Sequence, residues 1–513
     1  MTPRILQPVV RHLAAIAWLS VGAGVWGAAS ATAEGLTSNT AMEAVLQTAA
    51  KADHVEQLEI GRSVENRPLW AMRFTSPTPA AENKTCVVLL VGQQHGDEPA
   101  GAEALIDLVA ELAASPESLA TGLDLWIVPR INPDGAAAQQ RRNANDFDLN
   151  RDHVLLGQPE TQALHRLAQK IRPHIAVDCH EFRRDTGDYL EQGWTEWPLI
   201  MMDAGNLPIM PETLYDAGVA VCQAVASPMN RHGFNYQRYI IGSAPTPGAH
   251  GELRHSTLDP DDCRNSLSAH GTLSFIIESG IHRTASDPQA DLPERVAANR
   301  HLLDLLIGDP ELLAEARRVA EASRLEPMPG LIPTNTLWAN LSPKLTNVYV
   351  IDAATGQTVA VTTPTVMHDR VVKSAVPTPD AYVVDAEAAS TFAALLDAHN
   401  LAYATLDQPQ TFGAEAVALE RIEETYDAIY HRYAGRQVTA PLPASTTKFA
   451  AGSLLIDLQT LNPIDARRAA LVLEPRQLFG LYQWPAFAEH LRADGTLPVF
   501  RVFTADAVRV SSP

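Results

Sequence analysis

The stretch Thr85-Cys-Val-Val-Leu-Leu-Val-Gly92 is a short apolar run that ends in glycine, and the polar segment His95-Gly-Asp-Glu98 follows it closely. A continuous apolar run of this length is typical of a strand that is buried on both faces of a sheet. The pattern of residues 99–114 predicts a helix with proline in its first turn. A buried strand followed by a helix indicates an α/β fold.

The same alternation continues along the chain. Further strands are predicted at Leu123–Pro129, His174–Cys179 and Leu273–Glu278, and an amphipathic helix at Pro159–Ile171. Strands separated by helices predict a sheet with helices on both faces. Sites in such sheets gather beyond the carboxyl ends of the strands, so we expect a functional site where these strands end.

The pattern changes near the proline-rich segment Glu326-Pro-Met-Pro-Gly330, which we take as a domain boundary. Beyond it, strands are predicted at Asn347–Ile351 and Thr358–Thr362, and a helix at residues 386–399. No motif with catalytic spacing follows residue 330. We therefore expect a main domain at residues 34–325 and a smaller α/β accessory domain, whose role the sequence does not assign, at residues 326–513.

The N-terminus has the features of an export signal. Arg4 and Arg11 precede an apolar run that reaches Ala29, and Ala31-Thr-Ala33 matches the small-residue pattern of a cleavage site. An uncleaved membrane anchor is the alternative, because the run approaches the length that spans a bilayer. The Gly- and Ala-rich second half favours cleavage. We expect residues 1–33 to be a signal peptide and the mature protein to be secreted or periplasmic, without stable membrane insertion.

Composition excludes one class of partner. The formal net charge of −21 gives an acidic surface that repels phosphate groups, which argues against a nucleic-acid partner. A hydrophobic content of 46% over 513 residues is sufficient for a sizeable core. The four cysteines match no zinc-knuckle spacing, and the sequence gives no disulfide connectivity.

Metal-ligating residue types occur at two of the predicted strand ends. His95 and Glu98 are three residues apart, with Gly96 between them to allow a tight turn, and His180 follows the third predicted strand. Zinc binds imidazole nitrogen and carboxylate oxygen, and two histidines with one glutamate leave a fourth position for water, as in catalytic sites. Taken alone, His95 is better explained as a capping or solvated residue, and His180 equally well as a hydrogen-bonded histidine at a strand end. The prediction therefore depends on the two strand ends meeting.

A second motif suits an anionic ligand. Asn132-Pro-Asp-Gly135 is followed by Arg141-Arg-Asn-Ala-Asn-Asp-Phe-Asp-Leu-Asn-Arg151. The guanidinium groups of Arg141 and Arg151 can hold a carboxylate through paired hydrogen bonds, and Asn150 adds an amide donor. The alternative is a solvated loop with asparagine-rich turns.

Taken together and in order, these motifs and the later strand that ends in Glu278 resemble the zinc carboxypeptidase family related to carboxypeptidase A. The resemblance covers about residues 40–310 and is specific, because five pieces occur in the family's order. It implies a carboxypeptidase-like fold with a mixed central sheet. It also implies a metallocarboxypeptidase that hydrolyses the C-terminal peptide bond of peptides carrying a free carboxylate.

The resemblance implies a role for each matching residue. His95, Glu98 and His180 are the expected ligands of one zinc ion, and Glu278 the general base and acid. Arg141 is expected to polarise the scissile carbonyl and steady the oxyanion, while Asn150 and Arg151 bind the C-terminal carboxylate. Asp178 is a candidate for orienting a metal ligand. Glu181 is a weaker candidate for the base, because alternation along a strand turns it away from His180.

The chain departs from the family pattern at several positions. Asp146 stands where relatives often have glycine, and the family's mobile tyrosine has no clear match, with Tyr236 and Tyr239 as the nearest candidates. The residue that sets side-chain preference is expected between residues 250 and 271. Two other functions stay open: a zinc-dependent amidase or deacylase acting on N-acyl amino acids or cell-wall peptides, and a catalytically inactive peptide-binding relative.

Overall fold

The computed structural model describes residues 36–76, 85–247, 253–281, 289, 291–341, 345–364, 366–420, 425–427, 432–434, 437–438, 442–475 and 484–503. The predicted signal peptide, residues 1–33, lies outside the described residues. Within the described ranges, no helix combines the length and the apolarity needed to cross a bilayer.

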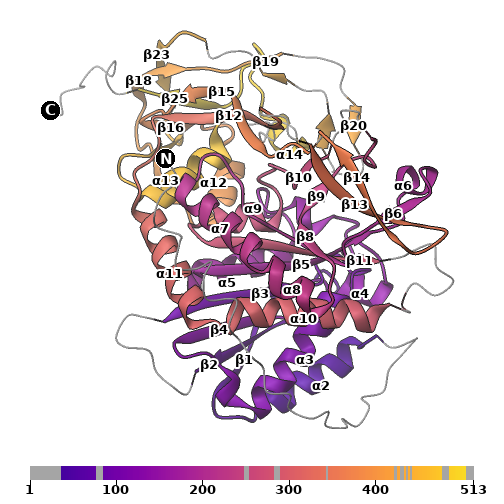
Figure 1. Cartoon of the computed structure of the whole chain (residues 1–513). Coiled ribbons are helices and arrows are strands. Elements are labelled where there is room, and N and C mark those ends of the chain that lie inside the picture. The colour runs from indigo at the N-terminus through magenta and orange to yellow at the C-terminus, as the bar shows by residue number, and fades with distance from the viewer. Residues whose placement is uncertain are drawn as a thin grey trace.

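The central element is an eight-stranded mixed sheet (Figure 1). Its order is β1 (Val55–Arg62), β2 (Pro68–Thr75), β4 (Leu123–Val128), β3 (Cys86–Gly92), β5 (Ile175–Arg183), β11 (Leu273–Ile281), β7 (Ile200–Ala204) and β8 (Tyr236–Arg238). The four strands predicted from the sequence, β4, β3, β5 and β11, form its parallel centre. On either side, β2 runs antiparallel to β4, and β7 antiparallel to β11. The predicted mixed sheet is confirmed.

Helices cover both faces of this sheet, as predicted. In β3, Val88 and Leu90 pack into one apolar core, and Leu89 and Val91 into another on the opposite face. The first core contains side chains from α2 (Asn39–Ala49), α3 (Ala100–Ala114), α7 (Glu212–Ala224), α10 (Leu292–Ile307) and α11 (Pro310–Leu325). The second contains side chains from α5 (Pro159–Ile171) and α9 (Cys263–Ser268). Shorter helices are α4 (Pro133–Ala138), α6 (Gly187–Glu191) and α8 (Ala226–His232).

Two central strands are longer than predicted. We expected the third and fourth strands to end at residues 179 and 278, but β5 continues to Arg183 and β11 to Ile281. The two strands stay paired in parallel register to their ends, with Glu278 opposite His180. The polar side chains therefore do not terminate the strands, because the ladder of backbone hydrogen bonds supports them.

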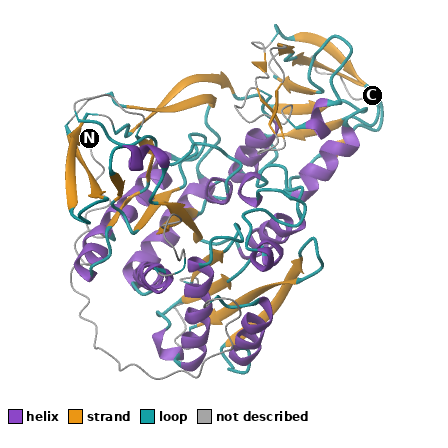
Figure 2. Cartoon of the chain, turned by 90° about the vertical axis from the view of Figure 1, so that its right-hand side faces the viewer, coloured by secondary structure: helices purple, strands orange, loops and turns teal. Residues whose placement is uncertain are grey.

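The C-terminal part is built mainly from antiparallel strands (Figure 2). Its largest sheet has the order β17 (Ala404–Thr405), β24 (Leu454–Asp457), β16 (Ala381–Val384), β25 (Val499–Val502), β18 (Gln410–Glu415) and β23 (Ser445–Phe449). The helices here are α12 (Ala389–Ala398), α13 (Pro463–Leu473) and α14 (Pro485–Ala488). The two strands predicted here are confirmed as β13 (Thr346–Asp352) and β14 (Thr358–Thr363), which pair antiparallel.

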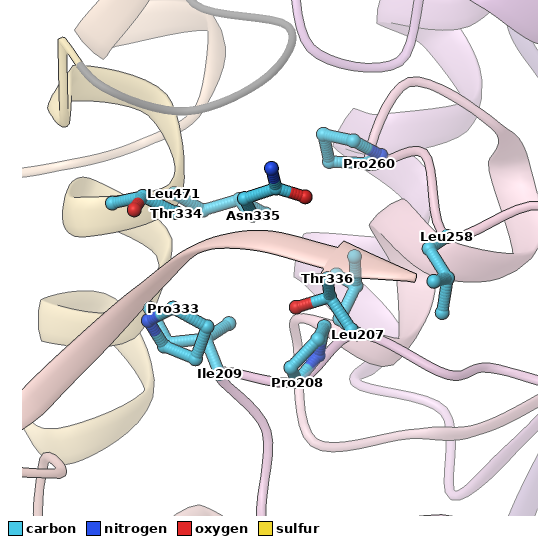
Figure 3. Close-up of a pocket in the computed structure, with 10 residues that line it drawn as sticks. All are labelled: Leu207, Pro208, Ile209, Leu258, Pro260, Pro333, Thr334, Asn335, Thr336 and Leu471. Atoms are coloured by element: carbon cyan, nitrogen blue, oxygen red, sulfur yellow. The ribbon is translucent and has the colours of Figure 1, made fainter. Parts of the chain in front are cut away.

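The C-terminal part contacts segments that connect the strands of the central sheet. In β12 (Leu331–Ala339), which pairs with β15 (Asp369–Pro377), the indole Nε1 of Trp338 donates a hydrogen bond to the Ser256 carbonyl at 2.8 Å. β13 also pairs with β6 (Trp194–Glu196). At the same junction, β12, α13 and the loops at 207–209 and 258–260 line a small pocket of about 40 Å³ (Figure 3). Contacts with β12 thus hold the segment that carries Ser256 in place.

The four cysteines are all buried and free. Cys86 lies in β3 and Cys179 in β5, where small apolar side chains pack in the core. They contribute packing and no cross-link in the described structure.

Candidate metal centre

Three residues from two segments of the chain meet at the carboxyl end of the sheet. His95 and Glu98 lie between β3 and α3, and His180 lies in β5; all three are buried. His180 Nδ1 lies 3.0 Å from His95 Nδ1 and 2.9 Å from Glu98 Oε2, while His95 Nδ1 lies 2.9 Å from Glu98 Oε1. One potential ligand atom of each residue lies within 4.8 Å of the others, so the side chains can hold a metal ion together.

Glycine is required at the turn that brings His95 and Glu98 together. A Cβ atom on Gly96 would lie 2.0 Å from the backbone carbon of Gly135. No side chain can be accommodated at that distance. The N-P-D-G motif therefore packs its own glycine directly against the metal-ligand turn, which explains why both motifs occur in one site.

The outer nitrogens of both imidazoles face carboxylates. His95 Nε2 lies 3.0 Å from Asp148 Oδ1, and His180 Nε2 lies 2.7 Å from Asp178 Oδ2. When each Nε2–H donates to its carboxylate, each Nδ1 presents a lone pair toward Glu98. Two lone pairs and a carboxylate at this separation need a cation between them. This donor set fits one zinc ion, with the carboxylates orienting the ligands.

Electrostatics at this group favour positive charge. Burial acts to lower the pKa of His180, but the charges of Asp178 and Glu98 outweigh it and raise that pKa well above its ordinary value. The pKa of His95 is raised as well, because Glu98 and Asp148 outweigh its burial. Burial acts to raise the pKa of Glu98, but the two histidines hold it well below its usual range.

Glu278 lies beside the metal group. It projects from β11 opposite His180 in register and is buried. Burial raises the pKa of its carboxyl group to about 7, with the Glu98 charge acting in the same direction. The Tyr239 hydroxyl hydrogen-bonds to this carboxyl group. Of the two tyrosines left open by the sequence, Tyr239 lines the cavity, whereas the Tyr236 hydroxyl donates to the Cys222 carbonyl.

The arginine motif lines the same cavity, which has a volume of about 200 Å³. Arg141 Nε donates to Asp148 Oδ2 at 3.0 Å, and its NH1 lies 3.3 Å from Glu98 Oε1. The Arg151 NH1 group donates to the Asn150 carbonyl at 2.6 Å. The Asn150 side chain is already engaged, because its Oδ1 accepts the Cys263 backbone N–H at 2.7 Å. Asn150 therefore also fixes α9 against the cavity.

Asp146, where the resemblance led us to expect glycine, adopts a left-handed backbone conformation. Its φ of 57° lies in the left-handed region, which asparagine and aspartate tolerate better than most residues. Arg142 NH1 donates to the Asp146 carbonyl at 3.0 Å. The substitution therefore does not displace Asp148, which follows two residues later.

The alternative base, Glu181, points to the other face of the sheet. Its Oε1 accepts the Ala100 backbone N–H at 3.1 Å, at the start of α3, and forms an ion pair with Arg295. This agrees with the alternation expected along the strand. Glu181 supports the helix that follows the metal ligands.

Sequence reasoning missed several residues of the site. Asp148 was quoted within its motif but not connected to His95, and Arg264 was not singled out, although it lines the cavity and is buried. The D-L-N-R spacing carried a signal for Asp148. Arg264, a charged residue next to the Asp261-Asp262 pair, carried a weaker one.

A second group of buried histidines lies behind the first. Gln94 connects them, because its Nε2 donates to Asp178 Oδ2 at 2.6 Å and its Oε1 lies 2.8 Å from His153 Nε2. His153 Nδ1 lies 3.0 Å from His165 Nε2, and the His165 ring packs against that of His399 in the C-terminal part. Burial lowers the pKa of His153 and of His399 to about 4, and that of His165 well below its ordinary value.

Comparison with known proteins agrees with this geometry. Residues 42–183 match the family model described as zinc carboxypeptidase. The chain is 35% identical over 179 residues to carboxypeptidase 2 of Trichophyton rubrum, a match covering 33% of each protein. It is 34% identical over 140 residues to carboxypeptidase D of Rattus norvegicus, covering 20% of this chain and 10% of that protein. The chain thus spans a third or less of the length of these relatives.

Two solved structures align with part of the chain. A metallo-carboxypeptidase from Burkholderia cenocepacia aligns with a TM-score of 0.42 and 18% identity, covering 53% of this chain and 69% of that one. A metallo-carboxypeptidase from Pseudomonas aeruginosa, in complex with (2-guanidinoethylmercapto)succinic acid, aligns with a TM-score of 0.41 and 20% identity, covering 55% and 70%. The family match contains six of the expected site residues, but Glu278 lies outside it.

Proposed function

We propose that the chain is a zinc-dependent metallocarboxypeptidase that releases the C-terminal residue of peptides, because residues 42–183 match the zinc carboxypeptidase family model. One observation carries the proposal. The metal-binding group, Glu278, Arg141 and Arg151 all line a single cavity. That cavity brings together a metal site, a base and a binding site for a carboxylate, which are the three requirements of this reaction.

His95, Glu98 and His180 would hold the zinc ion. Zinc supplies Lewis-acid chemistry, since it makes water nucleophilic near neutral pH and withdraws charge from a carbonyl oxygen. Glu278 accepts a proton from the attacking water and returns it to the leaving amine. A carboxyl group whose pKa burial raises to about 7 is well matched to both steps. The Tyr239 hydroxyl, bonded to Glu278, keeps that carboxyl group directed into the cavity.

The two arginines act on opposite ends of the terminal residue. Arg141 is held by Asp148 beside the metal group, where its guanidinium can stabilise the developing oxyanion. Arg151 binds the free carboxylate at the chain end, and the Asn150 carbonyl positions the guanidinium group by accepting from its NH1. An internal peptide bond presents no carboxylate to Arg151. Cleavage is therefore restricted to the last residue.

We also propose that the protein is exported. The supporting features are the basic start, the apolar run to Ala29 and the Ala31-Thr-Ala33 pattern of the sequence. Expression in a bacterial host with N-terminal sequencing of the exported protein should then give Glu34 as the first residue. A cell-associated protein that retains residues 1–33 would contradict the proposal.

The decisive experiment compares free and amidated peptides with otherwise identical sequences. Zinc-loaded protein should release the last residue from the free peptides only. Glu278→Gln should retain zinc and lower kcat by about 10²- to 10⁴-fold, because proton transfer is lost. Glu294→Gln, which changes an exposed glutamate of α10, is the matched control and should leave kcat unchanged.

Each contrary result has a separate meaning. Equal cleavage of the amidated peptides would favour an amidase or deacylase and overturn the carboxypeptidase proposal. Equal rates for Glu278→Gln and the parent protein would remove Glu278 from the mechanism.

A further inference from the structure

One wall of the cavity carries a charged residue that the proposed mechanism does not use. Arg264 lies at the start of α9 and lines the cavity beside Ser256, Thr257 and Asp262. Its side chain is only 1% exposed. A cation in the first turn of a helix is opposed by the helix dipole, and a buried one also loses its hydration. The cost of keeping arginine here calls for anionic or acceptor groups around it.

The anion next to Arg264 is already saturated. Asp262 Oδ1 accepts the Asn265 backbone N–H at 2.6 Å. Its Oδ2 accepts Arg264 NH2 at 2.8 Å and the Thr257 hydroxyl at 3.1 Å. The Ser256 hydroxyl donates its only proton to Asp203. These groups leave little acceptor capacity for a positively charged or donor-rich ligand.

Arg264, by contrast, keeps unused donors. A guanidinium group has five N–H bonds. NH1 donates to the Ser256 hydroxyl oxygen, and NH2 donates to Asp262 and to the Thr257 carbonyl. Its buried Nε has no hydrogen-bond partner among the described residues. This wall can therefore still donate hydrogen bonds from a positively charged group, but it can accept few.

The wall is also held in place from behind. Trp338 in β12 donates to the Ser256 carbonyl at 2.8 Å, and Leu258 and Pro260 pack toward β12 in the adjoining pocket (Figure 3). Because the loop is fixed on this side, Arg264 cannot easily leave the cavity to find water. Arg264 therefore stays in the cavity wall, where an acceptor that enters the cavity meets a positively charged group.

We propose that Arg264 sets side-chain preference, so that the enzyme favours peptides whose last residue carries an acidic side chain. This inference rests on the proposed function. Arg151 binds the main-chain carboxylate, and Arg264 receives the second carboxylate of a terminal glutamate or aspartate. A terminal lysine or arginine is disfavoured, because it brings a second cation beside a buried guanidinium group and finds little acceptor capacity in this wall.

The test uses the zinc-loaded, full-length protein and four peptides that differ only in the last residue: Glu, Gln, Leu and Lys. We expect kcat/KM for Glu to exceed that for Gln by at least ~10-fold, because a charge-assisted hydrogen bond replaces a neutral one, and Lys to be the slowest. Equal values for Glu and Gln, or a preference for Lys, would overturn this inference alone. Release from none of the peptides would overturn the proposed function together with it.

Variants assign the preference to the residue. Arg264→Gln should reduce the Glu-to-Gln ratio to about 1, mainly through KM, and Arg264→Lys should restore part of it. Arg183→Gln, which changes an exposed arginine at the end of β5, is the matched control and should keep the parent ratio. An unchanged ratio in folded Arg264→Gln would overturn the assignment. If that variant fails to fold, the peptide series with the parent protein decides.

Discussion

The molecule contains two groups of buried histidines that differ in their neighbours. His95 and His180 are backed by Asp148 and Asp178 and face Glu98. The second group, formed by His153, His165 and His399, is backed by an amide, by backbone carbonyls and by Arg468. Both groups are equally buried, yet the pKa values of the first are raised and those of the second lowered.

The difference teaches which feature makes a buried histidine a metal ligand. Burial alone keeps an imidazole neutral, because it penalises the charged form. A carboxylate behind the outer nitrogen fixes the tautomer and turns the other lone pair toward a cation. In this chain the carboxylates, and not the depth of burial, separate the functional histidines from the structural ones.

The largest expected effect comes from replacing one histidine in each of the two groups and comparing the variants. His180→Ala should lose the bound zinc and reduce peptide hydrolysis by more than ~10³-fold, because zinc chemistry underlies the reaction. His165→Gln, a buried histidine without a carboxylate, should retain one zinc per chain and the parent rate. Elemental analysis of zinc together with kcat/KM measures both. Zinc retained at full stoichiometry in His180→Ala would show that the carboxylates do not distinguish metal-binding histidines from structural ones.

The second effect concerns stability in acid. The pKa of His399 is about 4 in the folded protein, lowered by burial and by the Arg468 charge, and about 6.5 when unfolded. Between pH 6.5 and 4 the unfolded chain therefore binds more protons than the folded chain. The stability that is present above pH 6.5 is lost as the pH falls toward 4. For one buried histidine, the loss between pH 7 and 4.5 is on the order of 2–3 kcal/mol.

Urea denaturation of the parent protein and of His399→Gln at pH 7 and pH 4.5 measures this loss of stability. Glutamine can still donate to the Val154 carbonyl, which His399 Nε2 contacts at 2.7 Å. The variant should lose less free energy of unfolding on acidification than the parent, by about the amount given by linkage. An identical loss in both proteins would show that His399 does not titrate on unfolding.

The smallest effect tests the carboxylates themselves. Asp178→Asn keeps the shape of the side chain but weakens its hold on His180, and zinc affinity should fall by about 10- to 100-fold. Competition with a chelator measures the dissociation constant. Asp216→Asn, at an exposed position of α7, should leave it unchanged. No change in Asp178→Asn would mean that His180 is oriented by packing alone.

Much of this architecture could be predicted because its signals are local. The central strands are apolar on both faces, and parallel strands bring their ends to one edge, so the meeting of His95 and His180 followed from the order of strands and helices. The strands at the sheet margins carry less signal: in β1 the adjacent Glu56 and Gln57 break the alternation of apolar and polar residues, and β8 has only three residues. Such segments form strands because they pair with the adjacent strands of the sheet.

The remaining parts of the site depend on how distant segments pack. Asp148 reaches His95 only because the loop at 141–151 folds over the turn after β3. Arg264 enters the cavity because Asn150 anchors the start of α9 through the Cys263 backbone N–H. The D-L-N-R motif marks Asp148 but not its partner His95, and Arg264 has no characteristic spacing, so residue order alone could not reveal either contact.

Gln94 separates the two groups of histidines in a further sense. Its amide touches both Asp178 and His153, so a continuous line of hydrogen bonds runs from the metal ligands to the second group. A side-chain amide has no titratable proton near neutral pH, and it therefore passes no proton along that line. A proton bound on one side is thus not handed to the other. The protein can keep a cation-binding centre and a neutral core within a few side chains of each other.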